Sequence, residues 1–237
     1  MKILVLNSGS SSIKYQLFQM PSEKPLCSGL IDRIGLENAS VSHNNYFKGE
    51  VKKFRYLANL PDHEAGLGEV AKLLMDKDKG IISDSEEIEI VGHRVVHGGE
   101  SFSATMVINE EVKSEINRLF SLAPLHNPSN FKGIEVAEKI FARARQVAVF
   151  DTAFHQTIPE KAFRYAIPDS FYTQEGIRAY GFHGTSHKYV SEKAAKFLNN
   201  TDAKVITIHL GNGCSMAAVK NGESIDTAWV LGQIVVW

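Results

Sequence analysis

Two segments of the chain, 202 residues apart, share one pattern: a basic residue, four strand-forming residues, a polar turn that contains glycine, and a second strand. The first copy is Lys2–Ser12 and the second is Lys204–Ser215. An internal repeat constrains the whole fold, because each copy predicts the same supersecondary unit. Two such hairpins predict two related halves that face one nucleotide. The alternative is a chance similarity between two β-hairpins.

The turn of the first copy, Asn7–Lys14, has the composition of a phosphate-binding loop. Gly9 permits a positive φ angle and a close approach of the backbone to a ligand. The hydroxyls of Ser10 and Ser12, with the backbone N–H groups, can donate to phosphoryl oxygens. Lys14 adds a compact positive charge. The alternative is that this Ser/Gly-rich segment is only a hairpin turn.

Length and composition indicate an ordinary folded protein, since 237 residues with 43% hydrophobic and 22% charged side chains suffice for one large or two small domains. A net charge of −1 lacks the excess of Lys and Arg that nucleic-acid or membrane-surface binding requires. The first apolar run is too short for a signal peptide, and no run reaches transmembrane length. Cys27 and Cys214 give no disulfide framework. We therefore expect a cytoplasmic location and no nucleic-acid or membrane partner.

Hydrophobic periodicity predicts an α/β fold in which helices pack on a mixed sheet. The expected order in the first half is βββαβαβ, with strands at 2–7, 12–20, 26–34, 88–96 and 147–150 and helices at 62–76, 109–122 and 129–144. A helix at 187–199 then leads to strands at 205–208, 215–220 and 224–227. We expect a first domain over 1–150 and the beginning of a second over 151–237.

The run Val91–His97 places a possible anion-binding arginine on a strand. A period of two puts His93 and His97 on one face and Arg94 and Val96 on the other. Histidines four apart on a strand are about 13 Å apart, so a two-histidine metal site is not expected. A guanidinium beside a valine suits a small carboxylate with a short alkyl tail. A surface arginine in an ion pair is the alternative.

Asp151 follows the predicted strand 147–150 directly. Ligands collect at the carboxyl ends of strands in open α/β sheets, so this position is a candidate for a functional acid. An aspartate at this point also commonly begins a turn, and both interpretations stay open.

Histidines lie in three of the predicted loops. His183 stands between two glycines ahead of a helix, in a segment that can hold an imidazole rigidly toward a ligand. His187 belongs to the first turn of that helix and lacks the H-E-x-x-H pattern of a zinc site. His126 and His155 are candidates for hydrogen-bonded loop histidines, and we favour that interpretation for His155.

Five motifs in chain order together resemble the acetate kinase family: Asn7–Lys14, Gly92–Gly99, Phe150–His155, Tyr180–His187 and His209–Gly213. The resemblance runs from residue 1 to about residue 227. The family belongs to the sugar kinase, Hsp70 and actin superfamily, whose members close two ribonuclease-H-like halves over a nucleotide. The resemblance therefore implies a ribonuclease-H-like domain followed by the beginning of a duplicated copy.

The resemblance implies transfer of the γ-phosphoryl group of ATP to acetate, giving ADP and acetyl phosphate reversibly, with Mg²⁺ (or Mn²⁺). By this similarity Asn7 belongs to the magnesium site and Lys14 contacts ATP. The second turn is implied as a further phosphate loop, made of His209, Leu210, Gly211, Asn212 and Gly213.

The same resemblance assigns the acetate pocket and the catalytic groups. It implies that Arg94 holds the acetate carboxylate and that His183 stabilises the transition state. The methyl pocket is implied to be lined by Val96, Leu125 and Phe182. Asp151 corresponds to the active-site acid of the family. A carboxylic acid substrate is already ionised at pH 7, so its reaction hardly needs a base. We therefore expect Asp151 to orient magnesium and its waters rather than to remove a proton.

The resemblance ends after Ser224–Thr227, and the apolar run 228–237 is unlike the family. We therefore expect the second domain to lack the family's second catalytic arginine, its C-terminal acidic magnesium ligand and most of the adenosine pocket. Since one transition-state arginine contributes about 10³-fold or more to phosphoryl transfer, we expect this chain alone to be nearly inactive. Two alternatives stay open: a kinase for propionate or another short-chain acid, and a non-catalytic phosphate-binding fragment. The resemblance also implies a homodimer for the family's full-length chain.

Overall fold

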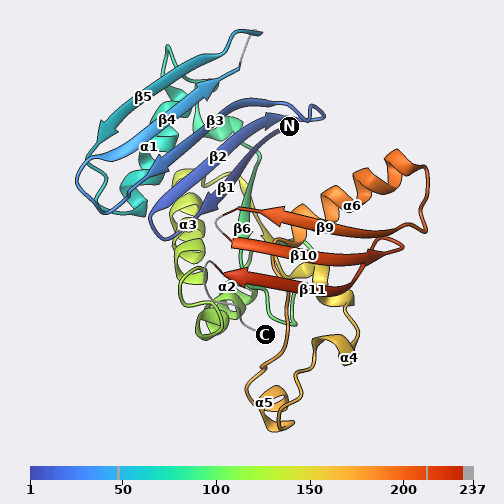
Figure 1. Cartoon of the computed structure of the whole chain (residues 1–237). Helices are drawn as coiled ribbons and strands as arrows, with labels where there is room; N and C mark the ends of the chain where they lie inside the picture. Colours follow the sequence, from blue (N-terminus) through green and yellow to red (C-terminus); the bar gives the residue numbers. More distant parts are fainter. Residues whose placement is uncertain (47–48, 212, 232–237) are drawn as a thin grey trace. The chain divides into compact units, whose positions relative to one another are not determined.

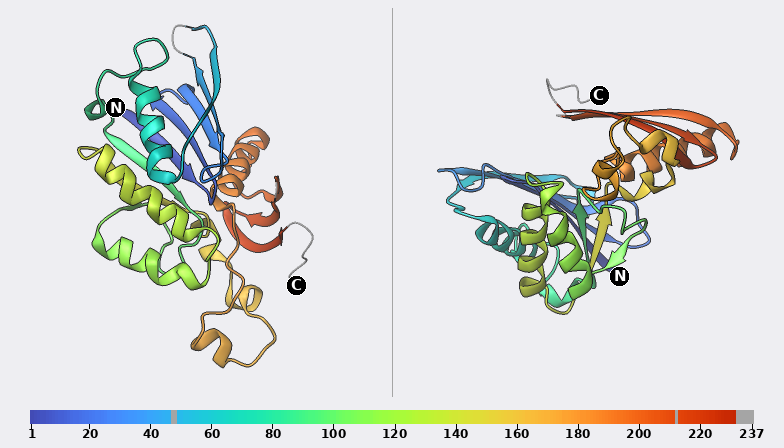
Figure 2. Two further views of the ribbon diagram at one scale, coloured as in Figure 1. Left: turned by 90° about the vertical axis from the view of Figure 1, so that its left-hand side faces the viewer. Right: turned by 90° about the horizontal axis from the view of Figure 1, so that it is seen from below.

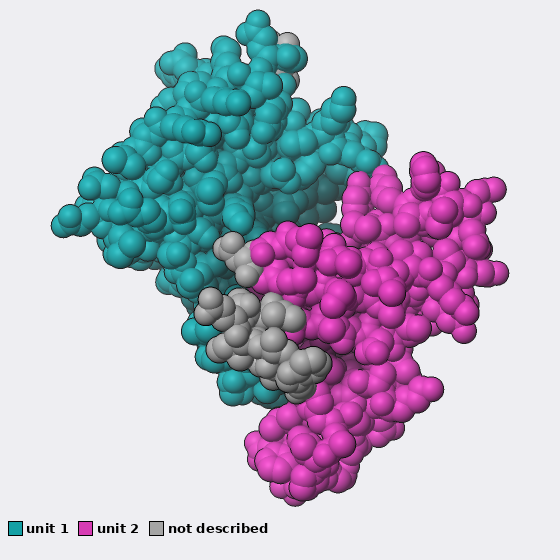
Figure 3. Space-filling view, in the orientation of Figure 1, with its two compact units in different colours: residues 1–95, 106–149 teal, residues 96–105, 150–237 magenta. Residues whose placement is uncertain are grey.

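The structure is a computed structural model, and it describes residues 1–46, 49–211 and 213–231 (Figure 1). The chain forms two compact units, coloured separately in Figure 3. The first unit comprises residues 1–95 and 106–149, and the second comprises residues 96–105 and 150–237. The two expected domains, 1–150 and 151–237, stay a prediction.

The first unit is built on a mixed sheet with the strand order β5-β4-β3-β2-β1-β6-β8-β7. Its strands are β1 (Lys2–Ser8), β2 (Ser12–Gln19), β3 (Pro25–Asp32), β4 (Ala39–Asn45), β5 (Lys52–Ala58), β6 (Ile90–Val95), β7 (Met106–Val107) and β8 (Arg145–Phe150). The first five strands are antiparallel neighbours. β6 then joins β1 in parallel, with Leu6 beside His93. This junction brings Asn7–Lys14 and Gly92–Gly99, two of the five sequence motifs, side by side.

Three helices cover one face of this sheet: α1 (His63–Met75), α2 (Glu110–Arg118) and α3 (Asn127–Ile140) (Figure 2). The short 3₁₀ helices are η2 (Ser85–Glu87) and η3 (Leu119–Ser121). Asp62 begins α1 because its carboxylate accepts the Ala65 N–H at 2.8 Å. Asn109 begins α2 in the same way through Val112 N–H. The apolar face of α1 packs into a core shared with the sheet, to which it contributes Leu67, Val70, Ala71, Leu73 and Leu74.

The second unit contains a three-stranded antiparallel sheet and one long helix, α6 (Gly184–Leu198). Its strands are β9 (Lys204–Leu210), β10 (Gly213–Lys220) and β11 (Glu223–Leu231), and its short helices are η4 (Ala153–Thr157), α4 (Glu160–Phe163) and α5 (Ser170–Thr173). Asn221 and Gly222 join β10 to β11 with φ values of +55° and +79°, as a tight hairpin turn requires. Residues 228–231 of the expected apolar tail continue β11, and 232–237 lie outside the described residues.

The structure confirms the α/β class and adds three strands that the sequence analysis did not predict: β4, β5 and the two-residue β7. β4 was missed because two of its buried positions are polar, His43 and Asn45. β5 is an edge strand in which Lys52, Lys53 and Arg55 are exposed, and the strand pattern is correspondingly weak. That the second unit begins a duplicated copy stays a prediction. Within the described residues, no helix is both long and apolar enough to cross a membrane.

Candidate functional site

The turn between β1 and β2 is closed by a hydrogen bond from Gly9 N–H to Ser12 O, 2.8 Å long. Gly9 does not use the positive φ that glycine permits, because it is not among the residues with positive φ. Its lack of a side chain matters for another reason. A Cβ at Gly9 would lie 3.2 Å from the Ser12 Oγ, closer than most real Cβ contacts.

Two helices anchor this turn through groups that the sequence analysis missed. His63 Nε2 of α1 donates to Gly9 O at 2.6 Å, and Asn130 Nδ2 of α3 donates to Ser8 O at 2.6 Å. Gly133 allows α3 to approach, since a Cβ there would lie 2.5 Å from Ser8 Oγ. These residues are 54 to 125 positions away from the turn, and no local pattern connects them with it.

The hydroxyl of Ser8 is buried and has no hydrogen-bond partner among the described residues. Buried polar groups are nearly always satisfied, and an orphaned one calls for an explanation such as an absent ligand or ion. The Ser8 side chain faces α3, because a Cβ on Gly133 of that helix would lie 2.5 Å from its Oγ, and it therefore lies on the opposite face of the sheet from Asn7.

Three of the expected site residues lie in one row across β2, β1 and β6. Lys14 is directly opposite Asn7 in the antiparallel pair, so both side chains project from one face of the sheet. The parallel pairing of β1 with β6 brings Arg94 beside Asn7, and Arg94 Nη1 donates to Asn7 Oδ1 at 3.4 Å. As the period of two predicted, Arg94 is only partly buried, whereas His93 and Val95 are buried. Unit 1 therefore assembles one amide oxygen and two cations.

The expected methyl pocket draws on both units, so its assembly stays a prediction. Leu125 belongs to the first unit and is 71% exposed. Val96 and Phe182 belong to the second unit, where Phe182 contacts the ring of Trp229 with the centroids 5.0 Å apart.

Asp151 lies directly after β8, as predicted, and it is buried. Its carbonyl oxygen accepts the Gly184 N–H at 2.9 Å. A Cβ at Gly184 would lie 2.3 Å from that oxygen, so only glycine fits this contact. The contact links Asp151 to His183, which has a left-handed φ of +55° and begins α6.

Four imidazoles gather in the second unit: His155, His183, His187 and His209, which we call the histidine cluster. The rings of His183 and His209 are stacked with centroids 4.1 Å apart, and those of His155 and His187 meet edge to face at 5.6 Å. His209 Nδ1 lies 3.0 Å from Ser186 Oγ. Sequence analysis singled out all four histidines but did not predict that they lie together.

Burial lowers the pKa of His187 to about 4 and also lowers the pKa of His155. Both rings are therefore neutral at pH 7. His155 Nε2 donates to Phe182 O at 3.0 Å, and its Nδ1 accepts from the Ser224 hydroxyl at 2.8 Å. The hypothesis that His155 is a hydrogen-bonded histidine is confirmed, but this residue lies in η4 and not in a loop.

The second phosphate loop is described in part. Leu210 is 80% exposed at the end of β9, and Gly211 N–H donates to Gly213 O at 3.1 Å. Asn212 lies outside the described residues. The role of this loop in binding phosphate stays a prediction.

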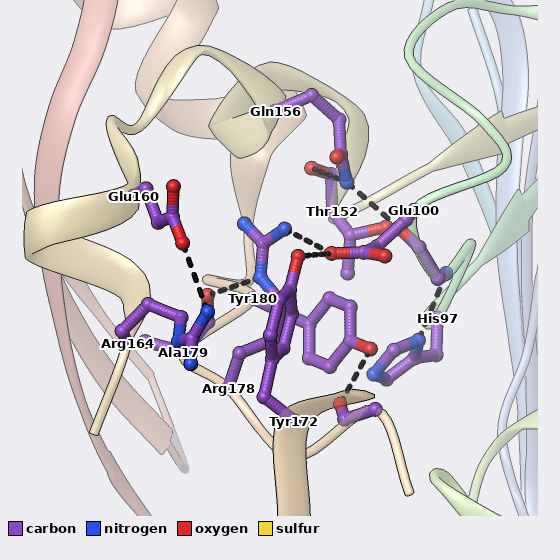
Figure 4. A network of polar contacts seen from close by, with 12 residues as sticks. His97, Glu100, Thr152, Gln156, Glu160, Arg164, Tyr172, Arg178, Ala179 and Tyr180 are labelled. Atoms are coloured by element: carbon purple, nitrogen blue, oxygen red, sulfur yellow. Dashed lines mark hydrogen bonds and ion pairs between the residues drawn. The ribbon is translucent and has the colours of Figure 1, made fainter. Parts of the chain in front are cut away.

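An ion pair that the sequence analysis missed fixes the segment ahead of His183 (Figure 4). The buried Arg178 guanidinium pairs with Glu100, and it lies over the ring of Phe163 with Cζ 3.4 Å from the ring centroid. Tyr172 donates to the same carboxylate at 3.2 Å. Two residues later, Tyr180 packs edge to face on His97 at 4.5 Å. Together these contacts hold residues 178–182 in one conformation.

Asn7 and Asp151 supply the oxygen donors that magnesium prefers. The described residues hold no group of three or more His, Cys, Asp or Glu side chains placed to bind a metal ion. Mg²⁺ commonly uses one or two protein oxygens and completes its shell with phosphates and water, so the side chains of Asn7 and Asp151 are each chemically suited to bind it. Asn7 belongs to the first unit and Asp151 to the second, and a magnesium site that includes them stays a prediction.

A large mixed sheet covered by helices, with an antiparallel β1–β2 hairpin beside the parallel strand β6, is consistent with a ribonuclease-H-like α/β protein. The model of the acetokinase family matches residues 2–233. The acetate kinase of Flavobacterium johnsoniae is 60% identical over 227 residues, which cover 96% of this chain and 56% of that protein.

Two solved structures superpose on 96% or more of the chain. The Porphyromonas gingivalis acetate kinase has a TM-score of 0.88 at 43% identity and is covered over 57% of its length. A propionate kinase from Francisella tularensis also has a TM-score of 0.88 at 43% identity, with 56% of its chain covered. The chain therefore belongs to the acetokinase family, and it spans little more than half the length of these relatives.

Proposed function

We propose that the protein is a carboxylate kinase that transfers the γ-phosphoryl group of ATP to acetate, forming acetyl phosphate and ADP reversibly. The observation that carries this proposal is the row of Asn7, Lys14 and Arg94 at the end of β1. This row contains one guanidinium, which suits a carboxylate, and one ammonium, which suits a phosphate. The identity to acetate kinases supports this choice of substrates.

Each group has a role that phosphoryl transfer requires. Arg94 fixes the carboxylate oxygen that attacks, because a guanidinium binds a carboxylate with two parallel hydrogen bonds. Lys14 and the backbone N–H groups of the first turn bind phosphoryl oxygens, as His183 does in the transition state. Asn7 and Asp151 would hold Mg²⁺ (or Mn²⁺), which neutralises charge on the phosphates when it is bound. Asp151 acts through the ion and its waters.

The remaining features of the proposal concern the whole protein. The chain spans 56% of the Flavobacterium relative, so we propose that it turns over slowly by itself and that full-length relatives supply further catalytic groups. We also propose that the full-length protein is a homodimer in the cytoplasm. We propose no nucleic-acid or membrane partner, because a net charge of −1 lacks the excess of positive charge that such partners require.

Propionate is the second candidate substrate, because a propionate kinase superposes as well as an acetate kinase does. One additional methylene in an apolar pocket changes specificity by about 10- to 200-fold. Parallel assays with the two acids therefore separate the candidates.

The experiment is formation of acyl phosphate from MgATP and either acid by the 237-residue chain, trapped as hydroxamate. We expect a rate about 10³-fold or more below that of a full-length relative, abolished by Arg94→Ala. Arg55→Ala, in the exposed edge strand of the same sheet, is the control and should leave the rate unchanged. Equal rates for wild type and Arg94→Ala would contradict the role of Arg94.

A further inference from the structure

Four side chains of the second unit form one continuous hydrogen-bonded chain, which we call the Thr207–His183 relay. Thr207 Oγ1 lies 2.7 Å from His187 Nδ1, His187 Nε2 lies 2.8 Å from Ser215 Oγ, and Ser215 Oγ lies 2.8 Å from His183 Nδ1. The members come from β9, α6, β10 and the residue that begins α6. Thr207, His187 and Ser215 are all at least 96% buried, so water does not compete for these hydrogen bonds.

The Ser215 hydroxyl couples the two imidazoles. It carries one proton and meets a ring nitrogen on each side, so it donates to one of them and accepts from the other. His187 is neutral and has one N–H, because burial lowers its pKa to about 4. The relay therefore has two possible directions, and each one fixes the proton on both rings.

The hydroxyl proton of Thr207, at one end of the relay, distinguishes these two directions. If His183 Nδ1–H donates to Ser215, then His187 Nδ1–H donates to Thr207, and the Thr207 hydroxyl proton has no acceptor among the described residues. In the opposite direction Thr207 donates to His187 Nδ1, His187 Nε2–H donates to Ser215, and Ser215 donates to His183 Nδ1. The two hydroxyl protons and the His187 N–H then have acceptors within the relay, and the remaining proton, on His183 Nε2, is at the half-buried end of it. Since a buried donor without an acceptor is strongly unfavourable, the second direction is favoured.

We propose that the relay runs from Thr207 to His183 and holds the His183 imidazole as the neutral tautomer with its proton on Nε2. Given the proposed function, this N–H is the group that donates to the transferred phosphoryl group, and Thr207, His187 and Ser215 are positioning residues. The ring of His209 is stacked on that of His183 with the centroids 4.1 Å apart. The other titratable groups that act on the relay are His155 and Asp151, from the segment after β8.

A donor of this kind has a chemical advantage. It is oriented before the reaction and requires no proton uptake, so it stabilises developing negative charge without reorganisation. Its hydrogen-bonding ability also does not depend on the fraction of imidazolium at a given pH.

The test is a long-range ¹H–¹⁵N spectrum of the histidine rings of the ¹⁵N-labelled chain at pH 7.5, assigned with His183→Gln and His187→Gln. We expect both rings to be protonated at Nε2 only. His155 serves as an internal reference, because its Nε2 faces the Phe182 carbonyl and must donate. Protonation of His183 or His187 at Nδ1 would overturn the proposal.

Variants test whether Ser215 causes the preference. Ser215→Ala should lower the preference of His183 for the Nε2–H form by about tenfold, the equivalent of one unsatisfied hydrogen bond. Ser215→Thr keeps the hydroxyl and should retain the wild-type preference of His183 for the Nε2–H form. Ser224→Ala, which removes the corresponding hydroxyl from His155, is the matched control and should leave His183 unchanged.

An unchanged His183 tautomer in a folded Ser215→Ala variant would also overturn the proposal. If that variant does not fold, the wild-type spectrum decides the direction alone. The spectrum needs no substrate and the hydroxamate assay needs no tautomer, so failure of the relay and failure of the proposed function are distinguishable.

Discussion

Gly184 shows at the scale of one residue how a loop motif is fixed by its surroundings. Its N–H bonds the Asp151 carbonyl, and its Cα faces that oxygen so closely that no side chain fits. The glycines around His183 could be recognised from sequence as signs of a tight loop. The contact between Gly184 and Asp151 could not be predicted from sequence, because Asp151 is 33 positions earlier in the chain.

Gly184→Ala should destabilise the second unit. The new Cβ would lie 2.3 Å from Asp151 O, so the backbone must shift, at a cost of about 1–3 kcal/mol. Gly68→Ala is the control: it also lies in a helix, no atom of the described residues lies within 4 Å of its Cβ position, and it should stabilise α1 by up to about 1 kcal/mol. Urea unfolding of both variants measures the difference, and equal stabilities would refute the steric argument.

His93 should make the first unit sensitive to acid. Burial lowers its pKa to about 4, while its Nε2 donates to Gln146 Oε1 at 2.8 Å. The unfolded chain takes up the proton near pH 6.5, so it binds more protons than the folded chain between pH 6.5 and 4, and stability falls as the pH is lowered through this window. The loss from this group approaches about 3 kcal/mol. In His93→Gln the stability curve from urea unfolding should be flatter over the same window, and parallel curves would contradict this account.

At the scale of elements, the first turn is held by helices rather than by its own residues. The strand–turn–strand pattern of 2–20 could be predicted because both strands alternate clearly, but His63 and Asn130 could not be assigned to it from sequence. The same limit applies to β4, where polar side chains are buried because the fold provides partners for them. His43 receives a hydrogen bond from Tyr15 at 2.7 Å and lies 3.1 Å from the Lys79 carbonyl.

Asn130→Ala should loosen the first turn. It leaves the buried Ser8 carbonyl without the amide donor, which costs about 1–3 kcal/mol. We expect faster amide hydrogen exchange at Gly9 and Ser10. Asn44→Ala removes a longer amide contact, 3.4 Å, from Ser28 elsewhere in the sheet and should leave exchange in the turn unaltered. Uniformly faster exchange throughout the unit would instead indicate a global loss of stability.

Glu100→Ala should release the segment that precedes His183. The Arg178 side chain is 4% exposed and would lose its carboxylate partner, whereas Glu100 itself is half exposed and partly screened, so we expect about 1–3 kcal/mol of destabilisation. Glu115→Ala breaks an exposed pair with Arg118 and should cost less than about 1 kcal/mol. Thermal unfolding of the two variants compares them, and a similar effect of both would show that burial of Arg178 is unimportant.

At the scale of the whole molecule, the order of five motifs along the chain indicates the family, and the family match over residues 2–233 confirms it. The fold divides the expected site residues between two units. Asn7, Lys14, Arg94 and Leu125 belong to the first, and Val96, Asp151, Phe182 and His183 belong to the second. In the first unit, α1 and α3 anchor the turn that contains the first of these residues. In the second unit, the histidine cluster and the Glu100–Arg178 pair hold the segment around His183.

The central claim is that Arg94 binds the carboxylate of the substrate. Titration of ¹³C-labelled acetate into the 237-residue chain, followed by NMR, tests it without requiring turnover. We predict binding that Arg94→Ala weakens by about tenfold or more, the loss expected for a charge-assisted hydrogen bond, and that Arg55→Ala leaves unchanged. Equal acetate binding by wild type and Arg94→Ala, or equal loss in both variants, would contradict the account.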